Sequence, residues 1–214
     1  MKIKNCCPLC LGDKISFFSK DQNRDYYQCS DCKLVFVLSE NFLSAKDEKA
    51  KYDHHQNSIE NSGYCQFLDR LLIPMQSYLK DGAKGLDFGS GPGPTLSIIM
   101  NKRGYDISIY DYFYENNPKV FESQYDFITS TEVIEHLHDV GGELDRLWQH
   151  LGKGGVLGLM SAFIPKNQQF DKWYYIRDLT HVRFFSRESF RWLAKNWDAD
   201  VVFPQDGVAI FLKR

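Results

Sequence analysis

The sequence lacks several features that would assign it to a common class of protein. No apolar run approaches the ~20 residues that a membrane-spanning helix needs. The N-terminal stretch MKIKNCCPLC lacks the apolar segment of a secretory signal. Basic residues are not in excess, since the formal net charge is −2 and the isoelectric point is about 6.3. We therefore expect a cytoplasmic protein that does not enter a membrane and does not hold nucleic acid by bulk electrostatics.

Internal repeats and low-complexity tracts are also absent. The 214 residues are enough for one large domain, or for a medium domain with a small module. Local composition favours the second arrangement. Residues 1–43 are dense in cysteine and predict a zinc-ribbon module, residues 44–63 are polar and predict a partly helical linker, and residues 64–214 alternate between strand and helix patterns.

Five of the six cysteines lie within the first 32 residues. Without a secretory signal, metal binding is favoured over a disulfide framework. Two C-x2-C pairs with 18 residues between them are typical of four thiolates around one tetrahedral zinc ion, and the predicted ligands are Cys7, Cys10, Cys29 and Cys32. Two redox motifs, or buried cysteines without a metal, are the alternatives. A segment this short buries little apolar area, so zinc would supply part of its folding free energy.

From residue 64 the pattern predicts an α/β fold. Strand patterns alternate with helix patterns, which is typical of βαβ units and a mostly parallel sheet. The last two strand patterns, ADVVFP and VAIFLK, are separated by QDG and predict a hairpin with one antiparallel strand. Residues 132–155 are expected to form a helix in two pieces, joined at Gly141 and Gly142.

A glycine loop, LDFGSGPG at residues 86–93, follows the first strand pattern of this region. Its G-x-G-x-G spacing departs from the G-x-G-x-x-G of dinucleotide sites, and nearby prolines remove N–H donors that a phosphate would use. The next strand pattern ends in Asp111, an acid placed to accept hydrogen bonds from ribose hydroxyls. A nucleoside cofactor without phosphate fits both features, and S-adenosylmethionine is such a molecule.

Four stretches together resemble the class I S-adenosylmethionine-dependent methyltransferases: LDFGSGPG, the acid of ISIYD, YDFITSTEVIEHLHD and LGKGGVLGLM. With the cysteine pattern and the late segment THVRFFS, the chain resembles small bacterial methyltransferases that carry an N-terminal zinc ribbon. The resemblance implies a Rossmann-like, doubly wound sheet, mostly parallel with an antiparallel last strand. The interval between Asp111 and Asp126 is too short for the family's usual helix and third strand, so we expect the third strand to be reduced or missing.

The resemblance also implies where the cofactor binds. Asp87 and the glycine loop would border its methionine part, Asp111 would hold its ribose, and residues after the fourth strand would face cofactor or substrate. An acidic wall suits the positive sulfonium. Tyr112 and Phe113 would cover the adenine or pack at the sheet edge. The expected cofactor-binding residues are Asp87, Gly89, Ser90, Gly91, Gly93, Asp111, Tyr112, Thr131 and Glu132.

Two histidines are candidate catalytic groups, because an acceptor often loses a proton when it is methylated. His136 follows the fourth strand and His181 lies in the long stretch after the fifth, both at the sheet edge where ligands bind. For each histidine the alternative is a structural role, in which its ring forms a hydrogen bond that holds a loop in place. His138 is expected to face solvent, and residues 170–178 are either a substrate lid or simple packing.

The favoured function is methyl transfer to a small-molecule acceptor that the sequence does not identify. RNA methylation with the ribbon as a recognition module is the second hypothesis, although residues 1–50 form no basic stripe. The motif for amino methylation is absent after the fourth strand, where TSTE stands. The third hypothesis is a zinc-ribbon binding protein on a methyltransferase scaffold without activity.

Overall fold

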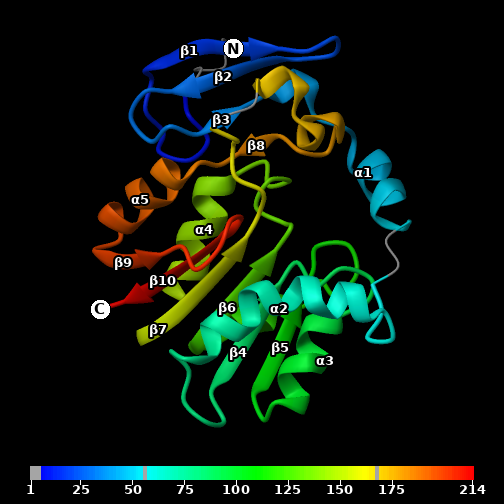
Figure 1. The fold of residues 1–214 in the computed structure, drawn as a ribbon, viewed down its shortest axis with the longest axis vertical. Helices are drawn as coiled ribbons and strands as arrows, with labels where there is room; N and C mark the ends of the chain where they lie inside the picture. Colours follow the sequence, from blue (N-terminus) through cyan, green and yellow to red (C-terminus); the bar gives the residue numbers. More distant parts are fainter. Residues whose placement is uncertain (1–5, 55–56, 167–168) are drawn as a thin grey trace.

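The computed structural model describes residues 6–54, 57–166 and 169–214, which form two sheets (Figure 1). The larger sheet has the strand order β5-β4-β6-β7-β10-β9. Its strands are β4 (Lys84–Phe88), β5 (Asp106–Tyr110), β6 (Tyr125–Thr131), β7 (Leu151–Met160), β9 (Ala199–Val202) and β10 (Val208–Lys213). The smaller sheet has the order β1-β2-β3-β8. Its strands are β1 (Ile15–Lys20), β2 (Asp25–Cys29), β3 (Val35–Phe36) and β8 (Arg183–Phe184).

Strand direction in the larger sheet confirms the predicted α/β fold. The pairs β4–β5, β4–β6 and β6–β7 are parallel, and β10 is antiparallel to both β7 and β9. Among the described residues, no strand pairs with the outer side of β5. The interval before β6 contains turns and the short 3-10 helix Pro118–Glu122 instead. The third strand of the family is therefore missing, as the short interval predicted.

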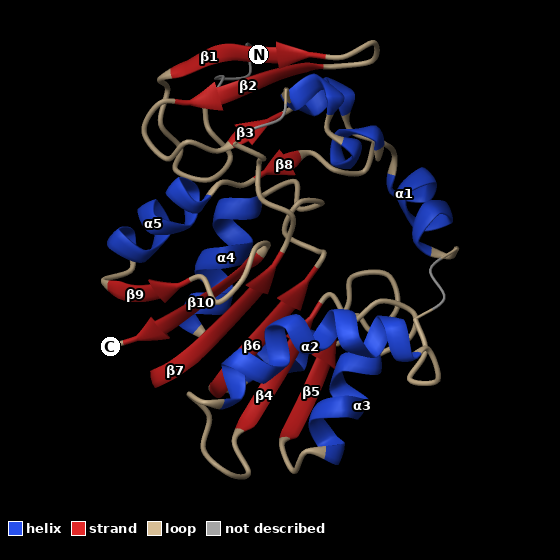
Figure 2. Ribbon diagram, in the orientation of Figure 1, coloured by secondary structure: helices blue, strands red, loops and turns tan. Residues whose placement is uncertain are grey.

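Helices cover both faces of this sheet (Figure 2). Successive residues of β6 pack on opposite faces of the sheet. Phe127 belongs to the apolar cluster on the face that α2 and α3 cover, and Ile128 belongs to the cluster on the face that α4 and α5 cover. This alternation is the period-2 pattern of strands buried on both faces. The helices of the chain are α1 (Ala45–Tyr52), α2 (Ser62–Gln76), α3 (Thr95–Lys102), α4 (Val140–Gln149) and α5 (Arg187–Asn196).

The two-piece helix expected over residues 132–155 is wrong. Residues 132–139 form turns, because Glu132 adopts a left-handed backbone with φ +52° that a helix cannot continue through. Helix α4 begins only at Val140, where the Asp139 side chain accepts a hydrogen bond from Gly142 N. Gly141 therefore lies in the first turn of α4 rather than at a join, and its N–H donates to the carbonyl oxygen of Pro8.

The smaller sheet joins the cysteine-rich segment to a segment late in the chain. Strand β8, which lies between β7 and α5 in the sequence, pairs with β3 of the cysteine-rich segment. The buried Arg24 strengthens this junction, because its guanidinium donates to the carbonyl oxygens of Ile176 and His181 at 2.8 Å each. The boundaries at residues 43 and 63 stay a prediction, and the predicted linker contains α1 and the first residues of α2.

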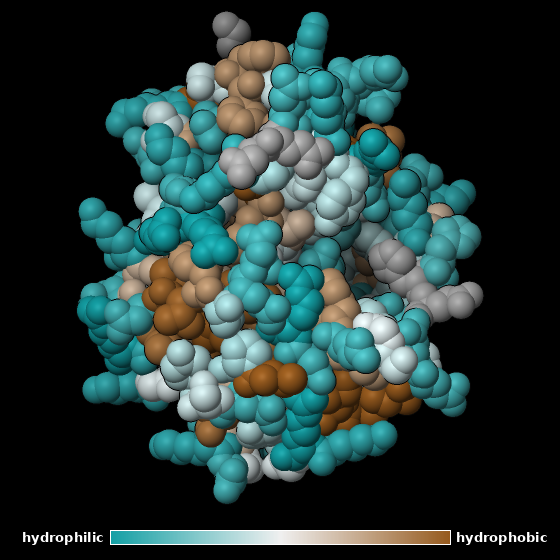
Figure 3. All heavy atoms as spheres, viewed as in Figure 1, coloured by the Kyte–Doolittle hydropathy of each residue, from teal (hydrophilic) through white to brown (hydrophobic). Residues whose placement is uncertain are grey.

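The surface is mainly hydrophilic on the face shown in Figure 3, where apolar side chains appear in separate patches. Within the described ranges, none of the helices has the length and apolar character needed to cross a bilayer.

Candidate functional site

A cavity of about 680 Å³ lies at the carboxyl ends of β4, β5 and β6. All the predicted cofactor-binding residues line it: Asp87, Gly89, Ser90, Gly91, Gly93, Asp111, Tyr112, Thr131 and Glu132. The candidate catalytic residues His136 and His181 line the same cavity. The structure thus brings together in one cavity every residue predicted for cofactor binding and catalysis.

The glycine loop forms a tight wall of this cavity. Gly89 has φ +81°, and a Cβ built on it would lie 2.3 Å from the Val133 side chain. A Cβ on Gly93 would lie 2.2 Å from the carbonyl oxygen of Asn57. Glycine is therefore required at both positions by backbone conformation or by close approach. Ser90 Oγ is buried and has no hydrogen-bond partner among the described residues, as expected for a group that awaits a polar ligand.

Asp111 holds the loop and its own turn in place. One carboxylate oxygen accepts from Gly91 N at 2.9 Å, and the other accepts from Phe113 N and Tyr114 N at 2.8 and 3.1 Å. A carboxylate offers about four lone-pair sites, so capacity remains for a ribose hydroxyl. These contacts fit the predicted role of Asp111 on a nucleoside.

Asp87 lies beneath the loop, fully enclosed. Burial raises the pKa of its carboxyl to about 7, the hydrogen bond from Thr129 Oγ1 at 2.9 Å opposes this change, and the charge of Asp111 adds to it. A cationic group bound in the cavity would favour the ionised form.

A cluster of buried polar groups lies beside the cofactor cavity. Tyr175 Oη donates to Glu135 Oε1 at 2.5 Å and lies 3.2 Å from Glu132 Oε2. Burial raises the pKa of Glu132 to about 7 and that of Glu135 well above its usual range. The Glu135, His136 and His181 side chains place one donor atom each within 4.8 Å of the others. Tyr175 lies in the stretch 170–178 predicted as a substrate lid or simple packing, whereas Glu135 was not among the predicted site residues, although it lies in the stretch EVIEHLHD.

The two histidines share one hydrogen-bonding arrangement. His181 Nδ1 lies 2.8 Å from the carbonyl oxygen of Tyr175, and His136 Nδ1 lies 3.2 Å from that of Thr180. Because a carbonyl oxygen only accepts, each neutral ring carries its proton on Nδ1 and its lone pair on Nε2. Burial lowers the pKa of His181, which keeps the ring neutral and able to accept a proton near pH 7.

Residues that were not predicted as site residues also line the cofactor cavity. Glu48 and Tyr52 of α1 line it, although the sequence analysis treated this segment as linker. His138 is exposed, as predicted, with its side chain 44% accessible. It also connects α1 to the loop after β6, because its Nε2 lies 2.9 Å from Glu48 Oε1 and its ring stacks on Phe42.

The four predicted zinc ligands converge. Cys7 Sγ lies 3.4 Å from Cys32 Sγ, and Cys10 Sγ lies 3.5 Å from Cys29 Sγ. All four sulfur atoms lie within 4.8 Å of one another. Four thiolates at the usual Zn–S distance of ~2.3 Å are spaced in this range, so the donor set fits a tetrahedral zinc ion.

Each pair of cysteines sits on the same kind of turn. Leu11 N donates to Cys7 O and Lys33 N donates to Cys29 O, and Leu11 and Lys33 both have positive φ, at 58° and 63°. Two matching turns, one from each C-x2-C pair, present the thiols from opposite sides.

Known proteins share the fold of this chain. Residues 52–202 match the family model described as a methyltransferase domain, and the chain belongs to that family. The magnesium protoporphyrin IX methyltransferase of Synechocystis PCC 6803, solved with bound SAH, is 14% identical with a TM-score of 0.53 over 79% of this chain and 94% of that one. An O-methyltransferase family protein of Burkholderia thailandensis is 9% identical with a TM-score of 0.50 over 78% and 62%. No curated protein matches. The protein is an S-adenosylmethionine-dependent methyltransferase with a Rossmann-like fold.

Proposed function

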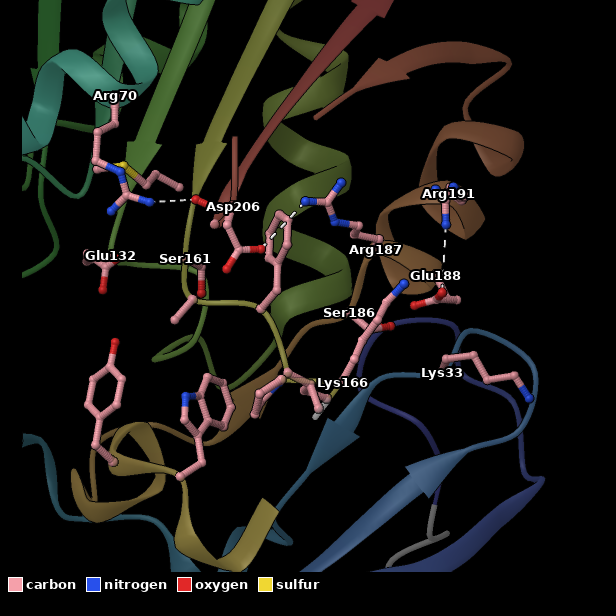
Figure 4. A pocket seen from close by; sticks show the side chains of 18 of the residues that line it. Lys33, Arg70, Glu132, Ser161, Lys166, Ser186, Arg187, Glu188, Arg191 and Asp206 are labelled. Carbon is pink, nitrogen blue, oxygen red and sulfur yellow. Dashed lines mark hydrogen bonds and ion pairs between the residues drawn. The ribbon is translucent and has the colours of Figure 1, made fainter. Parts of the chain in front are cut away.

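We propose that the protein methylates a small molecule bound in a second cavity beside the cofactor. This cavity has a volume of about 830 Å³ and shares Phe67 and Glu132 with the lining of the cofactor cavity (Figure 4). Its size is within the range of small-molecule sites. The shared wall is the observation that carries the proposal, because methyl transfer requires donor and acceptor to meet at one point.

The chain's own residues would bind and align the two molecules. S-adenosylmethionine supplies a methyl group activated by a sulfonium. The glycine loop and Asp87 would enclose its methionine part, and Asp111 would accept hydrogen bonds from its ribose. Alignment of donor and acceptor accounts for much of the rate enhancement in such displacements.

His181 and His136 line the cofactor cavity, with a ring separation of 4.7 Å. His181 would accept through Nε2 the proton of an acceptor that reaches from the second cavity to the methyl group in the cofactor cavity. Tyr175 would position His181, because its carbonyl oxygen holds Nδ1 and its ring lies 4.0 Å from the imidazole. Four cysteines, Cys7, Cys10, Cys29 and Cys32, would hold a structural zinc ion in the ribbon.

The proposed function is tested by supplying the purified protein with S-adenosylmethionine labelled in its methyl group, together with separate small-molecule and RNA fractions of a cell extract. We expect label to enter the small-molecule fraction. Label in RNA would support the second hypothesis, and cofactor binding without transfer to either fraction would support the scaffold without activity. Asp111→Ala protein serves as the background control.

Alanine in place of His181 should lower turnover by about 10² to 10⁴, the usual contribution of a general base, while cofactor affinity stays unchanged. Turnover is measured with an acceptor from the labelling experiment, and affinity by calorimetry with S-adenosylhomocysteine. His150→Ala is the matched control, because His150 Nδ1 also bonds a carbonyl oxygen, that of Ser123, outside both cavities. A fall in cofactor affinity would instead assign His181 a structural role.

Binding of the cofactor should depend on pH through Asp87 and Glu132, whose carboxyl pKa values burial raises to about 7. Both are largely neutral at pH 6 and largely ionised at pH 8, so the cationic S-adenosylmethionine gains attraction as the pH rises. S-adenosylhomocysteine lacks the sulfonium charge. We expect the affinity ratio of the two to increase roughly tenfold from pH 6 to pH 8. Calorimetry measures the ratio, and an Asp87→Asn/Glu132→Gln protein should show a flat one.

A further inference from the structure

The second cavity, in which we place the acceptor and which is called the acceptor cavity below, has an excess of basic side chains. The whole chain, in contrast, has a net charge of −2. The basic residues come from four separate parts of the chain, including the ribbon, and are Lys33, Arg70, Lys166, Arg187 and Arg191. The acidic residues of the lining are Glu132, Glu188 and Asp206. Side chains that converge from distant segments create a local positive potential that attracts an anionic ligand.

The five basic side chains outnumber the three acids, and the two ion pairs between them are long and exposed. Arg187 lies 3.6 Å from Asp206, and Arg191 lies 3.7 Å from Glu188 (dashed in Figure 4). Both acids are exposed, and solvent weakens exposed ion pairs at such distances, so they yield readily to a better partner. Within the described ranges, no ion pair involves Lys33 or Lys166.

Two of the basic groups are held in place before a ligand arrives. Arg187 and Arg191 lie one turn apart on α5, and both guanidinium groups lie over the ring of Phe203, at 5.2 and 5.4 Å from its centre. Arg187 also lies 5.6 Å from the ring centre of Phe163. Stacking on aromatic rings limits the rotamers of the two side chains, which reduces the entropy lost when they bind an anion.

Most of the basic side chains lie on the side of the cavity away from Glu132. Figure 4 shows Arg187, Arg191 and Lys166 on one side, and Arg70, Glu132 and Ser161 on the other. Glu132 belongs to both cavities and marks the transfer point. An acceptor anchored by an anionic group on the basic side would extend its body along the aromatic lining, which includes Phe163, Trp173 and Tyr174.

We propose that this cavity selects acceptors that carry an anionic group, a carboxylate or a phosphate, on a planar apolar body, and that Lys33 gives the ribbon a direct part in recognising them. The guanidinium fork suits both anions, because each offers two oxygens to paired N–H donors. This inference rests on the proposed function, since it assigns the acceptor class of that same site.

The test is calorimetry with three probes in the presence of saturating S-adenosylhomocysteine: 4-hydroxybenzoate, phenyl phosphate and the neutral 4-hydroxybenzamide. At least one anionic probe should bind about tenfold more tightly than the amide, and the tighter of the two distinguishes carboxylate from phosphate. The Arg187→Gln/Arg191→Gln protein should lose this preference, and Lys33→Gln should lose part of it. Lys195→Gln, an exposed lysine of the same helix outside the cavity, should keep it.

Equal affinities for the three probes, or no binding of any of them, would overturn the inference. The same result would follow if the preference survived in the Arg187→Gln/Arg191→Gln protein. Failure of S-adenosylhomocysteine to bind the unaltered protein would count against the proposed function instead, so the two failures are distinguishable.

Discussion

Cys29→Ser protein should lose its zinc ion and most of the structure of the ribbon, which we expect to be the largest loss of stability from any single substitution in this chain. Structural zinc contributes on the order of 10 kcal/mol to the folding of small modules. The ribbon would depend on zinc in part, because β1, the first strand of this module, contributes no fully buried side chain to a core. Metal analysis should find about one zinc per unaltered chain and less than half of one in the variant.

The damage should spread beyond the ribbon. Strand β8 pairs with β3, and Arg24 holds the carbonyl oxygens of the segment that ends at His181. Hydrogen exchange in residues 176–184 should therefore accelerate in the Cys29→Ser protein. Cys6→Ser is the matched control, because Cys6 is exposed and lies outside the four-sulfur cluster. Normal zinc content and normal exchange in the Cys29→Ser protein would show that the cluster is not a metal site.

Alanine in place of Asp111 should weaken S-adenosylhomocysteine binding about 100-fold. The substitution removes acceptors for three backbone N–H groups, including that of Gly91 in the loop, and removes the expected acceptor for the ribose. Each hydrogen bond to a charged group contributes about 1.5–3 kcal/mol, so loss of the ribose contact and of loop order together accounts for this change. Calorimetry measures the affinity, and thermal unfolding separates it from a global loss of structure.

Asp106→Ala is the control for this experiment, because Asp106 is an exposed acid at the start of β5, the strand that ends just before Asp111. It should bind S-adenosylhomocysteine as the unaltered protein does. Asp111→Asn should fall between the two, since the amide keeps one acceptor oxygen. Unchanged affinity in the Asp111→Ala protein would remove this residue from the cofactor site.

Much of the molecule could be predicted from local patterns. The G-x-G-x-G spacing requires a close backbone approach, and the structure shows the tight contacts of Gly89 and Gly93. The short interval after Asp111 leaves no room for another strand, and β5 is an edge strand among the described residues. These features depend on residues close together in the sequence, which is why a pattern reveals them.

Other features depend on contacts between distant residues, and no local pattern could have shown them. The residues EVIEHLHD have the apolar spacing of a helix, but they form turns because Glu132, the first of them, adopts a left-handed backbone conformation. Glu135 is fully buried only because Tyr175, 40 residues further along the chain, closes over it. Helix α1 lines the cofactor cavity only because the fold returns its polar sequence to the glycine loop.

The sequence by itself determined the parallel sheet, the glycine loop with its acid, and the four cysteines, since strand period, glycine spacing and thiol spacing are local properties of the chain. Only the tertiary structure decided that the cysteine-rich segment lines the second cavity, where we propose that the acceptor binds. It also decided that both histidines carry their lone pair on Nε2, and that basic side chains from four segments line the same cavity. The physical reason is that burial, tautomer and local potential depend on neighbours in space, which folding alone brings together.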